Sequence, residues 1–327
     1  MHPTEDAGAG GAATTGGGRH PLLDPQVVSA VEGVVSAHLG RRWRFEAFED
    51  LGDLASHPCG IIGGRGLAVF AKLSTDPTGP AMFEAELRGL DLLARRAGVA
   101  TPAAVGSGVV QVPSGVVLVV EALQGRRHRD RHPEDWRSIG ATLAAVHDVH
   151  GDRHGLEAFD GFYGPLPQDN RPTGAGTWAE FYAERRLRPR LRDAVDAGHL
   201  PTALASGVEG VLGRVDRLCG PEPVPTLLHG DAQQNNFVST DAGAVIVDAA
   251  PYFGHPEADL ALVDYLEPAS DAVFDGYRER RPIDAGFAGR RELWRLHGYL
   301  AGIAVGGDSA FGRLLLARLG VALDTYR

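Results

Sequence analysis

Two aspartates and one asparagine are spaced in this sequence in a way that suits phosphoryl transfer. Asp231 lies in the run HGDAQQNN, Asn236 follows it five residues later, and Asp248 follows the strand-like run AVIV. In such a layout one carboxylate orients an attacking hydroxyl group and accepts its proton, while the amide and the second carboxylate supply oxygen ligands for Mg²⁺. Each residue alone has an ordinary structural explanation, because His-Gly-Asp is a common turn and an aspartate often ends a strand. The prediction therefore depends on their order and spacing.

The chain contains a single lysine, Lys72, in the apolar run GLAVFAKLS, and every other member of its 32 Lys plus Arg residues is arginine. On the next predicted helix, Glu86 shares an apolar face with Phe83 and Leu90. A buried ammonium group and a buried carboxylate are each costly unless they are paired, so we expect Lys72 and Glu86 to form an ion pair. The alternative is a lysine that extends to solvent from an edge strand. The phosphoryl-transfer pattern favours the pair, since a compact ammonium group that contacts phosphate is not freely replaced by arginine.

These residues need a sheet and a helix to position them, and the first part of the chain predicts both. Residues 21–40 show helical apolar spacing that ends at a glycine. The β-rich runs at 43–50, 66–74 and 115–123 are typical of strands in one sheet, and the helix that carries Glu86 lies between the last two. We expect residues 21–123 to form an N-terminal lobe. Residues 1–20 are mostly Gly, Ala and Thr, and we expect them to form a disordered tail.

After about residue 124 the periodicity becomes mainly helical, which predicts a second lobe over residues 124–327 with the boundary near 121–125. A helix is expected at 135–150, and another at 177–195 that stops or kinks at Pro189. A hairpin over residues 237–247 separates Asn236 from Asp248. The expected fold is therefore α+β, with a small sheet lobe and a larger helical lobe.

Composition narrows the classes of partner. The net charge of −10 is spread along the chain without a basic stripe, which argues against a dedicated nucleic-acid binder. No apolar run approaches the roughly 20 residues of a membrane-spanning helix, and the N-terminus lacks the pattern of a signal peptide, so a cytoplasmic location is the expectation. The two cysteines, Cys59 and Cys219, form neither a disulfide framework nor a metal-ligand cluster.

From about Gly40 to Leu315 the sequence resembles the fructosamine kinase (ketosamine-3-kinase) family, within the protein-kinase-like superfamily that also contains aminoglycoside phosphotransferases and choline kinases. The resemblance is carried by the runs VFAKL, MFEAELRGLDLLA, GFYGPLPQDN, TWAEFYAERRL, LLHGDAQQNN and VDAAPYFGHPEADLAL. It implies a two-lobed protein-kinase-like fold and an ATP- and Mg²⁺-dependent phosphotransferase with an alcohol acceptor. The implied acceptor is the 3-hydroxyl of a ketosamine, a fructosamine or ribulosamine on a free amine or on a glycated lysine.

The resemblance also implies residue roles. Lys72 would contact the α- and β-phosphates and be held by Glu86, and Asp231 would be the base. Asn236 and Asp248 would bind magnesium, and the backbone from Glu121 to Leu123 would contact adenine. The residues implied on the sugar side are Gln168, Asn170, Trp178 and His255. His229 and Asp259 would support the catalytic loop.

Three departures from the family pattern leave alternatives open. The expected phosphate-binding loop reads ASHPCGIIGGRG over residues 55–66, with Pro58 where a flexible loop that donates amide hydrogen bonds is expected and with the thiol of Cys59 inside it. In the catalytic loop, Ala232 and Gln233 replace bulky apolar residues and Asn235 replaces glycine. The segment after Asp248 has two alanines before its proline. A kinase for another small alcohol, such as an aminoglycoside or a choline-like compound, and a catalytically weak nucleotide-binding regulator remain alternatives.

Overall fold

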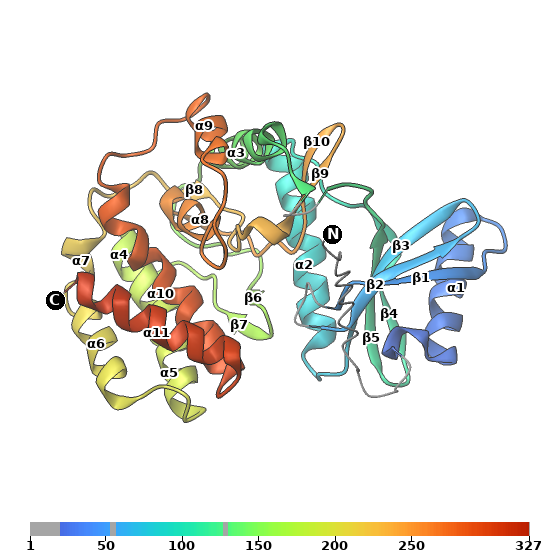
Figure 1. Ribbon diagram of the computed structural model, residues 1–327, viewed down its shortest axis with the longest axis horizontal. Coiled ribbons are helices and arrows are strands. Elements are labelled where there is room, and N and C mark those ends of the chain that lie inside the picture. Colours follow the sequence, from blue (N-terminus) through green and yellow to red (C-terminus); the bar gives the residue numbers. More distant parts are fainter. Residues whose placement is uncertain (1–19, 53–56, 127–129, 327) are drawn as a thin grey trace, which may run out of the picture.

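The computed structural model describes residues 20–52, 57–126 and 130–326. These residues form two lobes, a small one built on an antiparallel sheet and a larger one that is mainly helical (Figure 1). The expected tail lies outside the described residues except for His20. The Nδ1 atom of His20 accepts a hydrogen bond from the Leu22 backbone N–H at 3.2 Å and caps the first helical turn, η1 (Pro21–Leu23).

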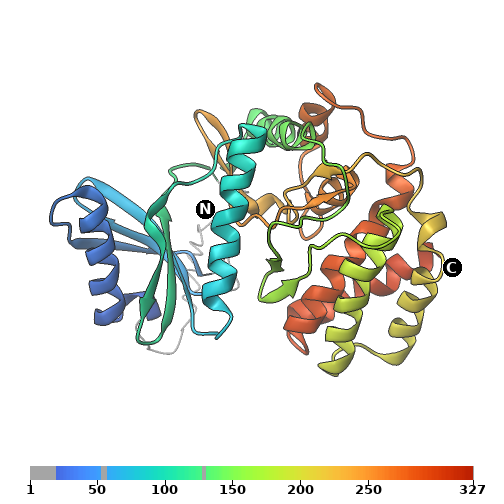
Figure 2. The same ribbon diagram turned by 180° about the vertical axis from the view of Figure 1, so that it is seen from behind.

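The small lobe contains a five-stranded antiparallel sheet with the order β1-β2-β3-β5-β4. Its strands are β1 (Phe45–Asp50), β2 (Cys59–Gly64), β3 (Leu67–Ser74), β4 (Ala104–Val112) and β5 (Gly115–Glu121). One face packs on α1 (Pro25–Leu39), and the other faces α2 (Gly79–Ala97). Figures 1 and 2 show α1 on the outer side of the sheet and α2 between the sheet and the helical lobe. Strand alternation places Lys72 on the α2 face.

The segment expected as a phosphate-binding loop is partly a strand, because β2 occupies residues 59–64 of it. This strand pairs with β1 on one side and β3 on the other, and this pairing overrides the weak strand propensity of its glycines. A Cβ atom at Gly64 would lie 2.2 Å from the Arg44 carbonyl oxygen, so glycine is required for the close approach of β1. Residues 53–56, in the connection between β1 and β2, lie outside the described residues.

The larger lobe is assembled around helices from its whole length. They are α3 (Pro133–His147), α4 (Trp178–Phe181), α5 (Arg188–Asp196), α6 (Thr202–Leu212), α7 (Val215–Leu218), α8 (Pro256–Leu262), α9 (Ala272–Arg278), α10 (Phe287–Gly306) and α11 (Ala310–Thr325). Its short strands are β6 (Gly161–Tyr163), β7 (Leu166–Gln168), β8 (Thr226–Leu227), β9 (Phe237–Thr240), β10 (Gly243–Ile246) and β11 (Phe253–Gly254). β9 and β10 form the expected hairpin.

The kink expected at Pro189 takes the form of a wide helical turn. Residues Tyr182–Leu187 (η4) form a π-helical turn between α4 and α5, and Pro189 follows at the start of α5. Proline has no N–H with which to donate to the Arg185 carbonyl oxygen four residues earlier, and its ring crowds that carbonyl. The side chain of Arg186 donates to this oxygen instead, at 3.0 Å.

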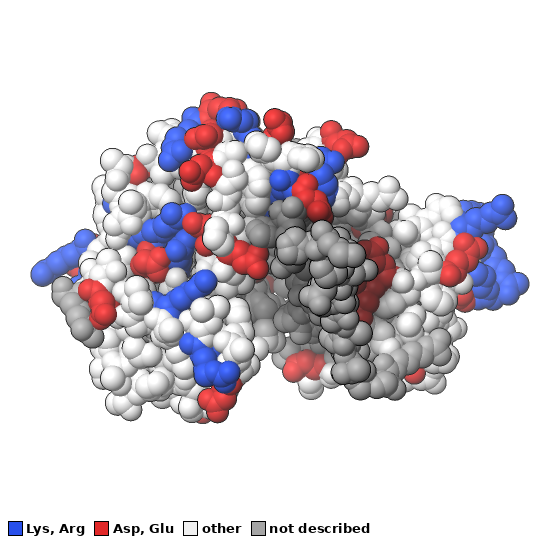
Figure 3. Space-filling model, viewed as in Figure 1, with Lys and Arg blue, Asp and Glu red and all other residues white. Residues whose placement is uncertain are grey.

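On the face seen in Figure 3, Lys and Arg side chains are interspersed with Asp and Glu side chains over both lobes. Among the described residues, no helix combines the length and the apolar character needed to cross a membrane. Cys59 is 1% exposed, and its Sγ donates to the Leu51 carbonyl oxygen at 3.3 Å. The thiol of Cys59, which the sequence places in the expected phosphate-binding loop, is therefore buried in β2.

Candidate active site

Two adjoining cavities lie where the lobes meet. The larger has a volume of about 560 Å³ and is lined from both lobes, including by Lys72, Asp231 and Asp248. The smaller has a volume of about 50 Å³ and is lined by the described residues at the end of β5 and by apolar side chains of the sheet. Glu86 and Asp248 line both, so the two cavities meet at these carboxylates.

Lys72 and Glu86 form the expected ion pair, with Lys72 Nζ 2.7 Å from Glu86 Oε2. The register of the sheet places Lys72 between Cys59 of β2 and Leu118 of β5, so its aliphatic stem is covered on both sides. Its side chain is 9% exposed and that of Glu86 is 13% exposed. Burial raises the pKa of Glu86, and the Lys72 ammonium group offsets only part of this effect.

Asp248 is the second partner of Lys72, with Oδ1 2.5 Å from Nζ. Burial opposes ionisation of Asp248, but the Lys72 ammonium group and a hydrogen bond with Glu86 together outweigh it and lower the pKa of this carboxyl to about 2. Among the described residues other than glycine, Asp248 alone has a positive φ, of 52°. Aspartate tolerates this left-handed conformation better than most residues, and such strain is often found at functional sites.

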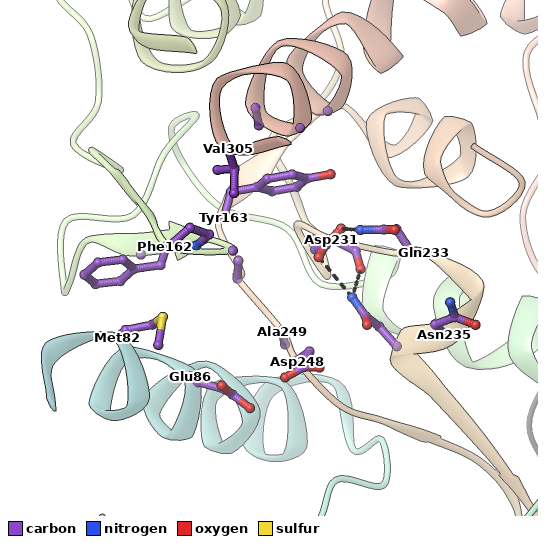
Figure 4. A pocket seen from close by; sticks show the side chains of 18 of the residues that line it. Met82, Glu86, Phe162, Tyr163, Asp231, Gln233, Asn235, Asp248, Ala249 and Val305 are labelled. Carbon is purple, nitrogen blue, oxygen red and sulfur yellow. Dashed lines mark hydrogen bonds between the residues drawn. The ribbon is translucent and has the colours of Figure 1, made fainter. Parts of the chain in front are cut away.

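Asp231 lies across the larger cavity from α2, on the loop that follows β8. Its Oδ1 accepts a hydrogen bond from Gln233 Nε2 at 2.7 Å, and its Oδ2 accepts one from Asn236 Nδ2 at 3.0 Å (Figure 4). The two oxygens of a carboxylate together have four acceptor positions, so Asp231 can still accept a hydrogen bond from a substrate hydroxyl group. The two amides therefore fix the orientation of the carboxylate without blocking it.

The pKa of Asp231 is raised to about 7. Burial is the largest cause, the Gln233 hydrogen bond opposes it, and the nearby charge of Asp248 adds to it. A carboxyl group whose pKa lies near 7 is suited to accept a proton at neutral pH. Asp248 stays ionised at the same pH, so the two aspartates differ in protonation and can differ in role.

The side chain of Asp259, in α8, binds backbone N–H groups of the loop that carries Asp231. Its two oxygens accept hydrogen bonds from the backbone N–H groups of His229 at 2.6 Å and Gly230 at 3.0 Å. His229 is fully buried, and its Nδ1 accepts from the Asp231 backbone N–H at 3.2 Å. Burial lowers the pKa of His229, which keeps its ring neutral. These contacts are structural, and neither side chain lines the larger cavity.

The donor set near Asp248 fits a hard cation. Asn236 Nδ2 donates to the Asp231 backbone carbonyl oxygen and side chain at 2.8 and 3.0 Å, so Oδ1 is the Asn236 atom that can bind a metal. Asp248 presents a carboxylate that is 37% exposed. Among the described residues there is no group of three or more His, Cys, Asp or Glu side chains that could hold a metal. Two oxygen ligands suit Mg²⁺, which keeps several waters and binds substrate phosphates.

The smaller cavity contains the residues implied for the base of a nucleotide. Glu121 and Leu123 line it at the end of β5, opposite Leu90 of α2 and Phe70 of β3. Apolar walls with a nearby strand end are suited to a flat heterocycle, whose edge can pair with backbone groups. The cavity opens toward Asp248, so a nucleotide base placed there directs its phosphates toward Lys72.

The four residues implied for the sugar side do not line the larger cavity. Gln168, the last residue of β7, and Asn170, two residues later, are both buried, and Asn170 Oδ1 accepts a hydrogen bond from Arg186 at 2.7 Å. Trp178 is fully buried and stacks on aromatic neighbours. His255 caps α8, and burial lowers its pKa to about 4. Their aromatic and amide groups pack within the helical lobe.

Several lining residues carried no sequence signal as site residues. His57, Phe162, Tyr163, Val305 and Phe311 line the larger cavity from four separate parts of the chain. Burial and the Lys72 charge lower the pKa of His57. The run GFYGPLPQDN could have pointed to Phe162 and Tyr163, because its turn residues predict a hairpin next to the residues chosen. No sequence pattern indicated Val305 and Phe311, which line the cavity because α10 and α11 pack closely together.

Comparison with known proteins identifies a family and a shared fold. The model of the family described as fructosamine kinase matches residues 27–312. A solved structure from Thermobifida fusca YX-ER1, assigned as a fructosamine-3-kinase, is 32% identical, covers 91% of this chain and 99% of its own, and has a TM-score of 0.73. A mouse ketosamine-3-kinase is 29% identical over 71% of this chain and 81% of its own length. The apo structure of a thermostable mutant of an aminoglycoside phosphotransferase is 15% identical, covers 90% of this chain and 99% of its own, and has a TM-score of 0.60, which shows a shared kinase-like fold.

Proposed function

Because this chain belongs to the fructosamine kinase family, we propose that it transfers the γ-phosphoryl group of ATP to the 3-hydroxyl of a ketosamine. The observation that carries this proposal is that the two cavities adjoin and share Glu86, Asn235 and Asp248 as lining residues. Glu121 lines the smaller cavity, Asp248 lines both, and Lys72 and Asp231 line the larger one. This is the order that a base, its phosphates and an acceptor hydroxyl require.

In the proposed mechanism Lys72 contacts the phosphates, and Glu86 holds its side chain in place. Asn236 and Asp248 would hold Mg²⁺, which neutralises charge on the transferred group. Asp231 orients the 3-hydroxyl and accepts its proton. The oxygen–phosphorus bond to the sugar forms as the bond to the bridging oxygen of ADP breaks, and Asp231 later gives the proton to solvent. Most of the rate enhancement would come from positioning and charge stabilisation.

The lining of the larger cavity argues against a polycationic acceptor. Among the described residues that line it, the carboxylates are Glu86, Asp231 and Asp248, and each already has a place in the proposed chemistry. An aminoglycoside carries several ammonium groups, and each would lose water without a carboxylate to replace it.

The test is phosphoryl transfer by the purified protein with ATP and Mg²⁺. The acceptors are fructosamines and ribulosamines, with an aminoglycoside and choline beside them, and mass spectrometry and phosphorus NMR locate the phosphate. We expect turnover of a ketosamine and a 3-phosphate product. Turnover of the aminoglycoside or choline alone would contradict the proposal, as would ATP binding without transfer to any acceptor.

The matched variant is Asp231→Asn, which keeps the shape of the side chain and removes its basicity. It should lower turnover by about 10²- to 10⁴-fold, the usual contribution of a general base. Nucleotide binding, measured by calorimetry, should stay within about twofold because Asp231 faces the acceptor. Full turnover in this variant would remove Asp231 from the assigned role.

A further inference from the structure

The charges that line the larger cavity are confined to one end. Lys72 is bonded to Glu86 and Asp248, and Asp231 faces them, while the remaining described lining has no Asp, Glu, Lys or Arg. Figure 4 shows Met82, Phe162 and Val305 on the side away from Asp231, Gln233 and Asn235. The cavity therefore has a charged end, where transfer takes place, and an apolar end.

We define the apolar wall as Phe162 and Pro165 of the β6–β7 hairpin, Val305 of α10 and Phe311 of α11, all of which line the cavity. The wall depends on close helix packing. A Cβ atom at Gly302 would lie 2.2 Å from the Leu315 side chain, so glycine lets α11 approach α10 and brings Phe311 to the cavity. A Cβ atom at Gly298 would lie 3.1 Å from the Tyr163 hydroxyl oxygen, which brings the hairpin to the same helix.

The outer part of this wall is open to solvent. Val305 is 52% exposed and Phe311 is 43% exposed, and both are among the few large apolar side chains with such exposure in the described part of the chain. Apolar surface of this kind gains free energy when a ligand covers it, at about 25 cal/mol per Å². The apolar wall and Asp231 line the same cavity, so a ligand that covers the wall would be part of the acceptor.

We propose that the acceptor is a ketosamine whose nitrogen carries an uncharged, apolar arm several carbons long, seated on the apolar wall. This inference rests on the proposed function. In a ketosamine the nitrogen is attached to C1, and C1 is two bonds from C3. An arm on the nitrogen therefore projects away from the hydroxyl that Asp231 binds. A charged arm would lose its hydration against Phe162 and Phe311 without gaining a partner. An alkyl chain, such as the methylenes of a lysine, would exchange water for apolar contact.

The experiment is a series of fructose adducts of ethylamine, butylamine and hexylamine, with the glycine adduct as the charged member. For the native protein kcat/KM should rise by about two- to fourfold for each added methylene until the arm passes Phe311, because each buried methylene stabilises the complex by a similar factor. The glycine adduct should be the poorest substrate. If fructose adducts fail, the ribulose series replaces them.

The variant Phe311→Ala should flatten the dependence on arm length while still turning over the ethylamine adduct. Leu314→Ala is the matched control, because Leu314 is 45% exposed on the same helix but does not line the cavity. Phe311→Arg should raise kcat/KM for the glycine adduct, since it supplies a partner for the carboxylate. This gain cannot result from misfolding.

The outcomes separate the two proposals. Turnover of all adducts with equal kcat/KM, or a length dependence that survives in Phe311→Ala, would overturn the apolar-arm inference and leave the proposed function standing. Failure to phosphorylate any ketosamine would overturn the proposed function and this inference together.

Discussion

The chemistry of the site depends on how three acidic side chains are arranged around one lysine. Lys72 is bonded to Glu86 and Asp248, and Asp231 faces them across the cavity. The Lys72 charge keeps Asp248 ionised, whereas burial leaves Asp231 with a pKa near neutrality. One aspartate is therefore prepared to bind a cation and the other to accept a proton.

The variant Lys72→Arg tests whether turnover requires a lysine at position 72. The guanidinium group is larger and planar, and between Glu86 and Asp248 it would bind the carboxylates in a fork instead of presenting a compact charge to phosphate. Turnover should fall by ~10²-fold or more, as for the loss of a donor that stabilises transition-state charge. Steady-state kinetics measure this, with Arg88→Lys on the exposed side of α2 as the control. An unchanged rate would show that either cation serves at position 72.

The pH dependence of kcat/KM for the acceptor should report Asp231. The base acts in its ionised form, so a pKa of about 7 predicts a rate that rises with pH below that value and levels above it. The Gln233 hydrogen bond favours the ionised form, so Gln233→Met should raise the pKa and move the acidic limb to higher pH. The profiles are measured at saturating nucleotide and metal. Gln111→Met, on the exposed side of β4, is the control, and an unmoved limb in Gln233→Met would contradict this account.

At the scale of elements, α2 connects the sheet to the catalytic segment. Its residue Gly89 lies so close to the segment after Asp248 that a Cβ atom would be 2.7 Å from Pro251 Cδ and 3.0 Å from the Ala249 carbonyl oxygen. The helix therefore carries Glu86 on one turn and contacts the segment after Asp248 on the next. This contact fixes the relative positions of Lys72, Glu86 and Asp248.

Two glycine-to-alanine exchanges in helices should have opposite effects. Alanine in a helix interior is ordinarily favoured over glycine by about 1 kcal/mol, and Gly33→Ala in α1 should gain stability because a Cβ there meets no atom within 4 Å. Gly89→Ala should instead lose stability by about 1–3 kcal/mol through overpacking, and should lower turnover as well. Thermal melts and kinetics on both variants test this. A stabilised, fully active Gly89→Ala protein would show that the segment after Asp248 moves freely.

At the scale of the whole molecule, the Lys72–Asp248 ion pair joins the two lobes. Lys72 belongs to the sheet of the small lobe, and Asp248 follows a strand of the large lobe. In the proposed mechanism Lys72 contacts phosphate and Asp248 binds the cation. The bound nucleotide and metal would then connect these two residues in place of their direct ion pair. Binding of nucleotide and metal should therefore raise the free energy of unfolding of the two lobes together.

We expect Mg²⁺ with ATP to raise the melting temperature more than ATP with a chelator does. A ligand at 100 times its dissociation constant stabilises the folded state by about 2.7 kcal/mol. In Asp248→Asn, which keeps the side-chain shape and tolerates positive φ, the difference between the two conditions should largely disappear. The control is Asp241→Ala on the 98% exposed side chain in the β9–β10 turn. A metal-dependent shift that persists in Asp248→Asn would place the cation elsewhere.

The sequence by itself determined the two lobes, the Lys72–Glu86 pair and the hairpin between Asn236 and Asp248. These follow from local periodicity, from the cost of burying an unpaired charge, and from turn residues at short range. β2 and β4 were not predicted, because their glycines weaken the local strand propensity. β2 forms through pairing with β1 and β3, and β4 forms through pairing with β5 at the edge of the sheet.

Only the tertiary structure decided which side chains line the cavity. Gln168, Asn170, Trp178 and His255 lie in notable sequence runs, yet they are buried in the helical lobe. Phe162 is far from Val305 and Phe311 in the sequence, and these side chains meet because glycines of α10 allow the hairpin and α11 to pack closely. Chemistry that depends on residue type and spacing is visible in a sequence. The shape of an acceptor site depends on long-range packing, which leaves no local pattern.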